Sequence, residues 1–115
     1  MKTLSADQIV AELAPFLAEA GIVQVSVEVR PYDEPPFDTH PVADVTFSLD
    51  GTSPEDAVRR MKALERAIGK AHGCSVRTGY YGREEGYDDI PDGHAMIEID
   101  QLPFTLDRTS APAPR

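Results

Sequence analysis

The sequence predicts an α+β domain, a two-layer sandwich in which two helices cover one face of a four-stranded, mainly antiparallel sheet. Apolar residues recur at helical spacing within residues 5–21 and 53–73. They alternate at strand spacing in four further segments, residues 22–30, 42–50, 75–82 and 94–102. The chain has 115 residues, 41% of them hydrophobic, which suits one domain with a single core.

Residues 53–73 carry the strongest local signal in the chain. Ser53 can accept a hydrogen bond from the free amides of a first helical turn, and Pro54 suits the first helical position. Gly73 suits the left-handed residue that ends many helices. One face of this helix is apolar, and the opposite face carries a row of cations, Arg59, Lys62, Arg66 and Lys70.

A second helix is predicted from Ser5 to Gly21. Ser5 and Gln8 have the spacing of a capping box, and Gly21 suits the helix end. Pro15 lies inside the pattern, where it removes one amide hydrogen bond and crowds the preceding turn. We therefore expect a kink or a short break at Pro15.

The four strands should each turn one apolar face toward the helices. In the first strand we expect Val23, Val25, Val27 and Val29 to face the core. The outer face should then be polar and acidic, with few aromatic residues on its middle strands. This composition disfavours nucleic-acid binding through the sheet, which requires aromatic side chains set among cations.

The order of elements is helix, strand, strand, helix, strand, strand. If the fourth strand inserts between the second and third, the sheet has the order 1-2-4-3 and resembles a circularly permuted ferredoxin-like fold. The alternative is a parallel pairing of the second and third strands with the fourth at an edge. We expect a single domain over residues 1–102 and a loose, proline-containing tail over residues 103–115.

Two long loops are candidate binding segments. Residues 31–41 contain four prolines and would present Tyr32, Phe37 and His40. Residues 82–93 are rich in acids and would present Glu84, Glu85, Tyr87, Asp88 and Asp89 to a partner. The alternative, which the sequence favours, is that both loops are plain connectors, the first stiffened by proline and the second solvated by its charges.

The net charge is -9, so the row of cations on the second helix is a local reversal of sign. We expect this row to be either an ordinary solvated helix face or a docking surface for an acidic partner, including a second copy. A nucleic acid is disfavoured as a partner, because its binding requires many cations along the contact surface. Whether the protein binds a small molecule is not predicted by the sequence.

The compartment predicted from the sequence is the cytoplasm. No apolar segment approaches a membrane span, no signal peptide is recognisable at the start, and a single cysteine cannot form an internal disulfide. The absence of asparagine and the excess of arginine over lysine favour a GC-rich bacterial or phage genome.

No catalytic signature emerges. Cys74 follows His72 at a helix end, where the negative end of the helix dipole disfavours a thiolate. The cluster Asp88, Asp89, Asp92 and His94 lacks the spacing of a calcium or zinc site, so neither a metal nor another cofactor is predicted.

These observations favour a non-enzymatic protein interaction or assembly module, a subunit of a homo-oligomer or of a larger complex. One alternative is a small acidic regulatory or inhibitory protein that binds a cationic site on a nucleic-acid-binding target. The other is a small ferredoxin-like enzyme with a site in a loop cleft.

Overall fold

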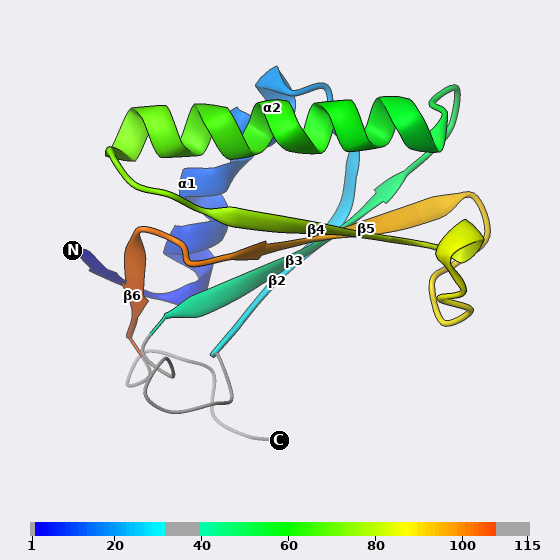
Figure 1. Cartoon of the computed structure of the whole chain (residues 1–115). Coiled ribbons are helices and arrows are strands. Elements are labelled where there is room, and N and C mark those ends of the chain that lie inside the picture. Colours follow the sequence, from blue (N-terminus) through cyan, green and yellow to red (C-terminus); the bar gives the residue numbers. More distant parts are fainter. Residues whose placement is uncertain (1, 32–39, 108–115) are drawn as a thin grey trace.

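A computed structural model describes residues 2–31 and 40–107 (Figure 1). Its elements in chain order are β1 (Lys2–Leu4), α1 (Ala6–Glu19), β2 (Gln24–Pro31), β3 (Pro41–Ser48), α2 (Pro54–His72), β4 (Arg77–Gly82), the 3₁₀ helix η1 (Arg83–Glu85), β5 (His94–Asp100) and β6 (Phe104–Leu106). Every predicted helix and strand is present, and β1, η1 and β6 are additional.

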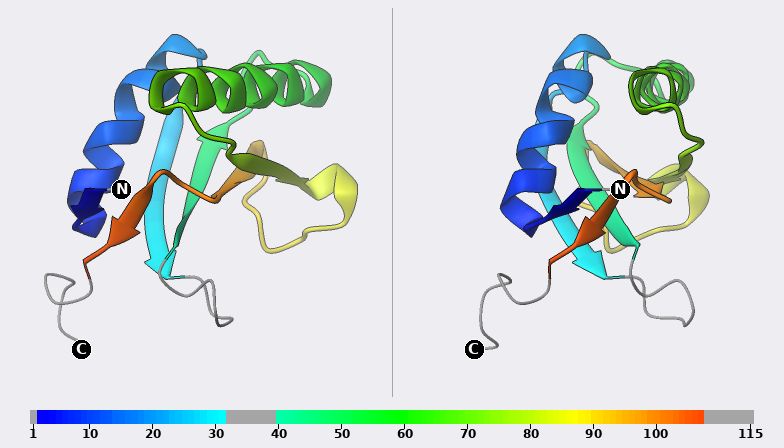
Figure 2. Two further views of the ribbon diagram at one scale, coloured as in Figure 1. Left: turned by 60° about the vertical axis from the view of Figure 1, so that its left-hand side comes forward. Right: turned by 90° about the vertical axis from the view of Figure 1, so that its left-hand side faces the viewer.

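The main sheet has the order β2-β3-β5-β4, and every neighbouring pair in it is antiparallel. The last long strand, β5, thus lies between β3 and β4, as the predicted order 1-2-4-3 requires. The alternative with β3 and β4 paired in parallel is wrong. Both helices lie on the same side of this sheet, α2 across it and α1 along β2 (Figures 1 and 2).

One hydrophobic core lies between the helices and the sheet. The inward residues of β3 and β5 are fully buried, among them Val45 and Ile97. They pack in one cluster with the apolar faces of both helices, represented by Leu13 and Leu64. The alternation in the strands and the helical spacing therefore converge on the same interior, as predicted.

The helix ends follow the local chemistry of their sequences. Ser5 and Gln8 form the complete capping box, and the Ser53 hydroxyl accepts a hydrogen bond from the Asp56 amide at 3.2 Å. Gly21 and Gly73 close α1 and α2 with φ of +74° and +62°. Of the kink or short break expected at Pro15, the break is wrong, since α1 is continuous from Ala6 to Glu19, and the kink stays a prediction.

The first long strand departs from the simple alternation that its valines suggest. Strand β2 begins at Gln24, and its register against β3 shifts between Gln24 and Ser26. Such a bulge interrupts the strict alternation of faces. Val27 and Val29 pack against the core, but Val23 lies before the bulge and is 71% exposed, so its predicted burial is wrong.

A second, two-stranded sheet joins the two ends of the described chain. Strand β1 pairs in parallel with β6, and Lys2 lies opposite Phe104. Phe104 and Leu106 are buried in the core, so the expectation that residues 104–106 belong to a loose tail is wrong. Residues 108–115 lie outside the described residues. Neither described helix combines the length and apolar character needed to cross a membrane.

Candidate functional site

The outer face of α2 carries the predicted row of cations. Arg59, Lys62, Arg66 and Lys70 are all exposed, on the side of the helix opposite its buried residues. Arg59 forms an ion pair with Asp56 one turn earlier. Within the described part of the chain, Lys62, Arg66 and Lys70 form no ion pair, so three adjacent positive charges face solvent without neutralisation.

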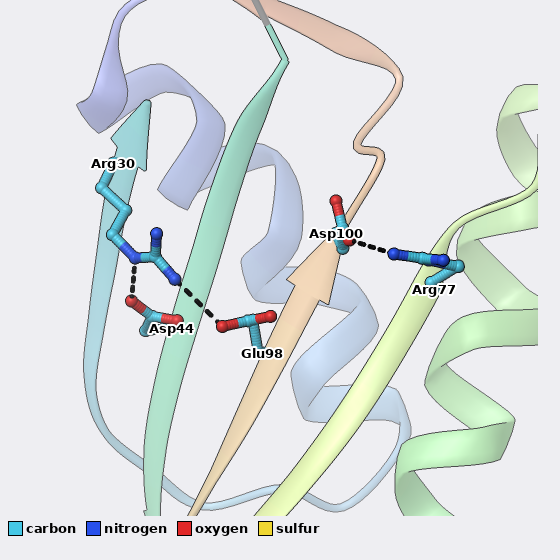
Figure 3. A network of polar contacts seen from close by, with 5 residues as sticks. All are labelled: Arg30, Asp44, Arg77, Glu98 and Asp100. Atoms are coloured by element: carbon cyan, nitrogen blue, oxygen red, sulfur yellow. Dashed lines mark hydrogen bonds and ion pairs between the residues drawn. The ribbon is translucent and has the colours of Figure 1, made fainter. Parts of the chain in front are cut away.

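Unlike these three cations on α2, the arginines of the sheet lie next to carboxylates. Arg30 lies 2.7 Å from Asp44 and 2.9 Å from Glu98, and it bridges three neighbouring strands (Figure 3). Arg77 lies 2.8 Å from Asp100 on the same outer face. These pairs neutralise much of the negative charge that the sequence places on the outer face of the sheet, which makes that face a weaker docking surface than α2.

Strand register produces the Arg30 cluster. Glu98 lies directly opposite Asp44 on neighbouring strands, which brings two like charges together. The Arg30 guanidinium, from the next strand, donates to both carboxylates. Asp44 Oδ1 is buried and has no hydrogen-bond partner among the residues that the structure describes, so the two Arg30 hydrogen bonds are important for stabilising this pair of carboxylates.

The acidic loop after β4 has a defined backbone shape. The Arg83 guanidinium donates to the carbonyl oxygens of Asp88 and Ile90 at 3.1 and 2.9 Å, and the Ile90 side chain is buried. The predicted partner-binding acids are all exposed on this folded segment, together with Asp92: Glu84, Glu85, Asp88 and Asp89. Arg83 therefore fixes the backbone of the loop, while the carboxylates of the loop point to solvent.

Two tyrosines of β4 connect the acidic loop to the sheet. The Tyr80 hydroxyl donates to Glu84 at 2.5 Å, and burial, this hydrogen bond and the charge of Glu84 raise the pKa of Tyr80. Burial and then the charge of Glu98 raise the pKa of Tyr81. The ring of Tyr87, which is exposed, meets Tyr81 edge to face at 4.9 Å. Both β4 phenols thus stay protonated at neutral pH, and the Tyr80 hydroxyl acts as a hydrogen-bond donor to Glu84.

The remaining sequence candidates do not come together. Tyr32 and Phe37 lie outside the described residues. His72 packs between the rings of Phe16 and Phe104, at centroid distances of 6.0 and 5.3 Å, and Cys74 packs against the core. Among the described residues, no three His, Cys, Asp or Glu side chains are arranged to hold a metal ion.

A pocket of about 330 Å³ lies where the end of α1 meets the turn before α2. It is lined by Gly21, Ile22, Val23, Phe47, Ser48, Asp50, Gly51, Thr52 and Arg60. Sequence reasoning missed it, because its two walls are about 30 residues apart in the chain. The one available signal was Arg60, a cation displaced by about 100° from the row of the other α2 cations.

Searches of the chain against protein-family models, curated protein sequences and solved structures found no match. What the protein does must therefore be inferred from its own fold and side chains.

Proposed function

We propose that the protein is a non-enzymatic interaction and assembly module that docks through the cationic face of α2. The observation that carries the proposal is the contrast between paired and unpaired cations. Arg30, Arg77 and Arg83 each lie beside a carboxylate. Lys62, Arg66 and Lys70 have no carboxylate partner among the described residues, although the chain has an excess of acids.

The three charges form a compact and rigid row. From residue 62 to residue 70 the helix rises by about 12 Å, and every cation is separated from the next by one turn. The face is carried by a helix of 19 residues that is capped at both ends and buried along its opposite side. A rigid row of this kind attracts a negatively charged surface and orients it during association.

A second copy of the chain is the partner that best fits this row. The segment from Glu84 to Asp92 presents five exposed carboxylates on a loop that Arg83 holds in shape. Docking that loop on the α2 face of the next copy is a heterologous contact, because two different surfaces meet. Such contacts build rings or filaments, which suits a subunit of a larger assembly.

Light scattering as a function of salt tests this proposal. Between about 0.01 M and about 1 M salt the Debye length falls from about 30 Å to about 3 Å, so an association driven by exposed charges should weaken strongly. We expect oligomers at low salt that dissociate as salt rises. A protein that is monomeric at both limits, at micromolar concentration, would refute self-assembly through these surfaces.

A second candidate function is favoured by the order of the acidic loop. Because Arg83 fixes the backbone around Asp88 and Ile90, the loop backbone loses little conformational freedom on binding. This favours a regulatory protein that occupies a cationic site on a nucleic-acid-binding target. Replacing Glu84, Glu85, Asp88, Asp89 and Asp92 by the corresponding amides should abolish such binding, and binding that persisted would exclude it.

We also propose that the main sheet is a circular permutation of the ferredoxin-like fold. The order β2-β3-β5-β4, antiparallel throughout with both helices on one side, supports this relation. A chain rearranged so that β5 precedes α1 should then fold with the same sheet. A rearranged chain that shows no cooperative unfolding transition by circular dichroism would count against the relation.

A further inference from the structure

We propose that the pocket between residues 21–23 and residues 48–52 binds a small zwitterion, an α-amino acid with a short apolar side chain. The ligand carboxylate would face Arg60, its ammonium would face Asp50, and its side chain would lie against Val23. This site is separate from the α2 face described above and does not depend on association.

The two walls of the pocket meet at one end of the molecule. The end of α1 and the turn between β3 and α2 lie side by side at the top of both views in Figure 2. The floor is apolar, since Ile22 and Phe47 are buried. Val23 lines the pocket while it is 71% exposed, so it offers apolar surface that a ligand can cover.

Two opposite charges line this pocket without neutralising each other. Arg60 uses one guanidinium nitrogen, Nη1, to donate to the Gly21 carbonyl oxygen at 2.5 Å, and it forms no ion pair in the described part of the chain. The Asp50 carboxylate likewise has no partner among the described residues. This differs from the sheet, where Arg77 pairs with Asp100. A ligand with both charges could complete both interactions.

The pocket is largely preformed. Thr52 donates its amide to the Leu49 carbonyl oxygen at 2.7 Å, and Asp50 donates its amide to the Ser48 hydroxyl at 3.1 Å. Gly51 takes a φ of +70°, which completes this tight turn. Because the turn and the Arg60 side chain are held in place, binding would cost little ordering of the protein.

Size and charge restrict the class of ligand. A volume of about 330 Å³ lies at the lower end of the range for small-molecule sites, which excludes dinucleotides and other large cofactors. A simple anion would be attracted by Arg60 but repelled by Asp50. A simple cation would be attracted by Asp50 but repelled by Arg60. A zwitterion satisfies both groups, and the exposed valine favours a short apolar side chain over a polar one.

Amide chemical shifts in ¹H–¹⁵N spectra of the intact chain test the proposal. L-Alanine, L-valine and L-leucine are titrated in turn, and at least one should shift the amides of residues 21–23 and 48–52 in a saturable manner. Isovalerate is valine without its ammonium, and isobutylamine is valine without its carboxylate. Both should bind at least about tenfold more weakly than valine, because each leaves one charge of the pocket without a partner.

Two variants and one control locate the site. Asp50→Asn removes a charge that makes no described side-chain contact, so the variant should fold normally and bind at least about tenfold more weakly. Arg60→Gln should weaken binding similarly. Arg59→Gln changes the adjacent cation, which lies about 100° away around the helix and does not line the pocket, and it should leave binding unchanged. The inference is overturned if none of the three amino acids shifts these amides, if isovalerate binds as tightly as valine, or if Asp50→Asn retains full affinity.

Discussion

The Arg60 guanidinium donates a hydrogen bond to the Gly21 carbonyl oxygen at 2.5 Å and so joins α2 to the end of α1. Gly21 adopts the left-handed conformation that ends α1 and turns its carbonyl toward α2. Arg59, the preceding residue, is turned away by about 100° around the helix axis and pairs only with Asp56 among the described residues. Two adjacent arginines thus have different roles, one in the fold and one on the surface.

Replacing these two arginines by alanine should separate the roles. Arg60→Ala removes a charge-assisted hydrogen bond between elements, and we expect it to lower the free energy of unfolding by about 1 kcal/mol, allowing for partial exposure. Arg59→Ala should change that free energy by less than about 0.5 kcal/mol. Urea denaturation measures both. Equal effects of the two substitutions would contradict the structural role of Arg60.

Arg30 should be important for the stability of the sheet. Its removal in Arg30→Met leaves Asp44 and Glu98 facing each other without a cation. Since the Arg30 side chain is 38% exposed, the expected loss is about 1–2 kcal/mol, below that of a fully buried pair. Added salt should recover part of this loss by screening the repulsion. A loss that is unchanged by salt would argue against like-charge repulsion as its cause.

The β6 strand should behave as part of the core. Phe104 is 2% exposed and packs in the main cluster, so Phe104→Ala should lower the free energy of unfolding by about 3–4 kcal/mol. Thr105→Ala, in the same strand and partly exposed, is the control and should cost less than about 1 kcal/mol. Thermal or urea unfolding distinguishes the two variants. A Phe104→Ala variant as stable as the wild type would show that β6 is dispensable for the stability of the fold.

Tyr80 predicts a loss of stability at alkaline pH. Its pKa is raised in the folded state, so the folded protein holds the phenolic proton more tightly than the unfolded chain does. Stability from this group is complete below the ordinary tyrosine pKa of about 10 and declines as pH rises above it. Above that pH, the free energy of unfolding should decline less steeply in Tyr80→Phe than in Tyr87→Phe, because the latter variant retains Tyr80. Denaturation curves across this range measure the difference, and equal slopes would refute it.

The parts of the fold that depend on local chemistry could be predicted from the sequence. Ser5 and Ser53 cap the two helices as their positions indicate, and Gly21 and Gly73 end them. The alternation in β3 and β5 correctly identified the inward residues, because strand periodicity places side chains on alternate faces regardless of the partner strand.

Features that depend on contacts between distant residues were missed. Strands β1 and β6 have three residues each, too few for a periodic pattern, and they are stabilised by pairing with each other and by packing of Phe104 and Leu106 in the core. The bulge that exposes Val23 depends on the register of β2 against β3. The pocket around Arg60 joins two turns that no local pattern relates. Tertiary packing decides each of these.

A charge exchange between two variants tests the central claim most directly. One variant carries Lys62→Glu, Arg66→Glu and Lys70→Glu, and the other carries Glu84→Lys, Glu85→Lys and Asp88→Lys. Light scattering at low salt should show that each variant alone associates less than the wild type, because in each the two proposed contact surfaces have the same sign. When the two variants are mixed, the cationic loop of one can contact the anionic helix face of the other, and a complex should form again. Wild-type association in either variant alone, or no complex in the mixture, would contradict docking of the acidic loop on α2.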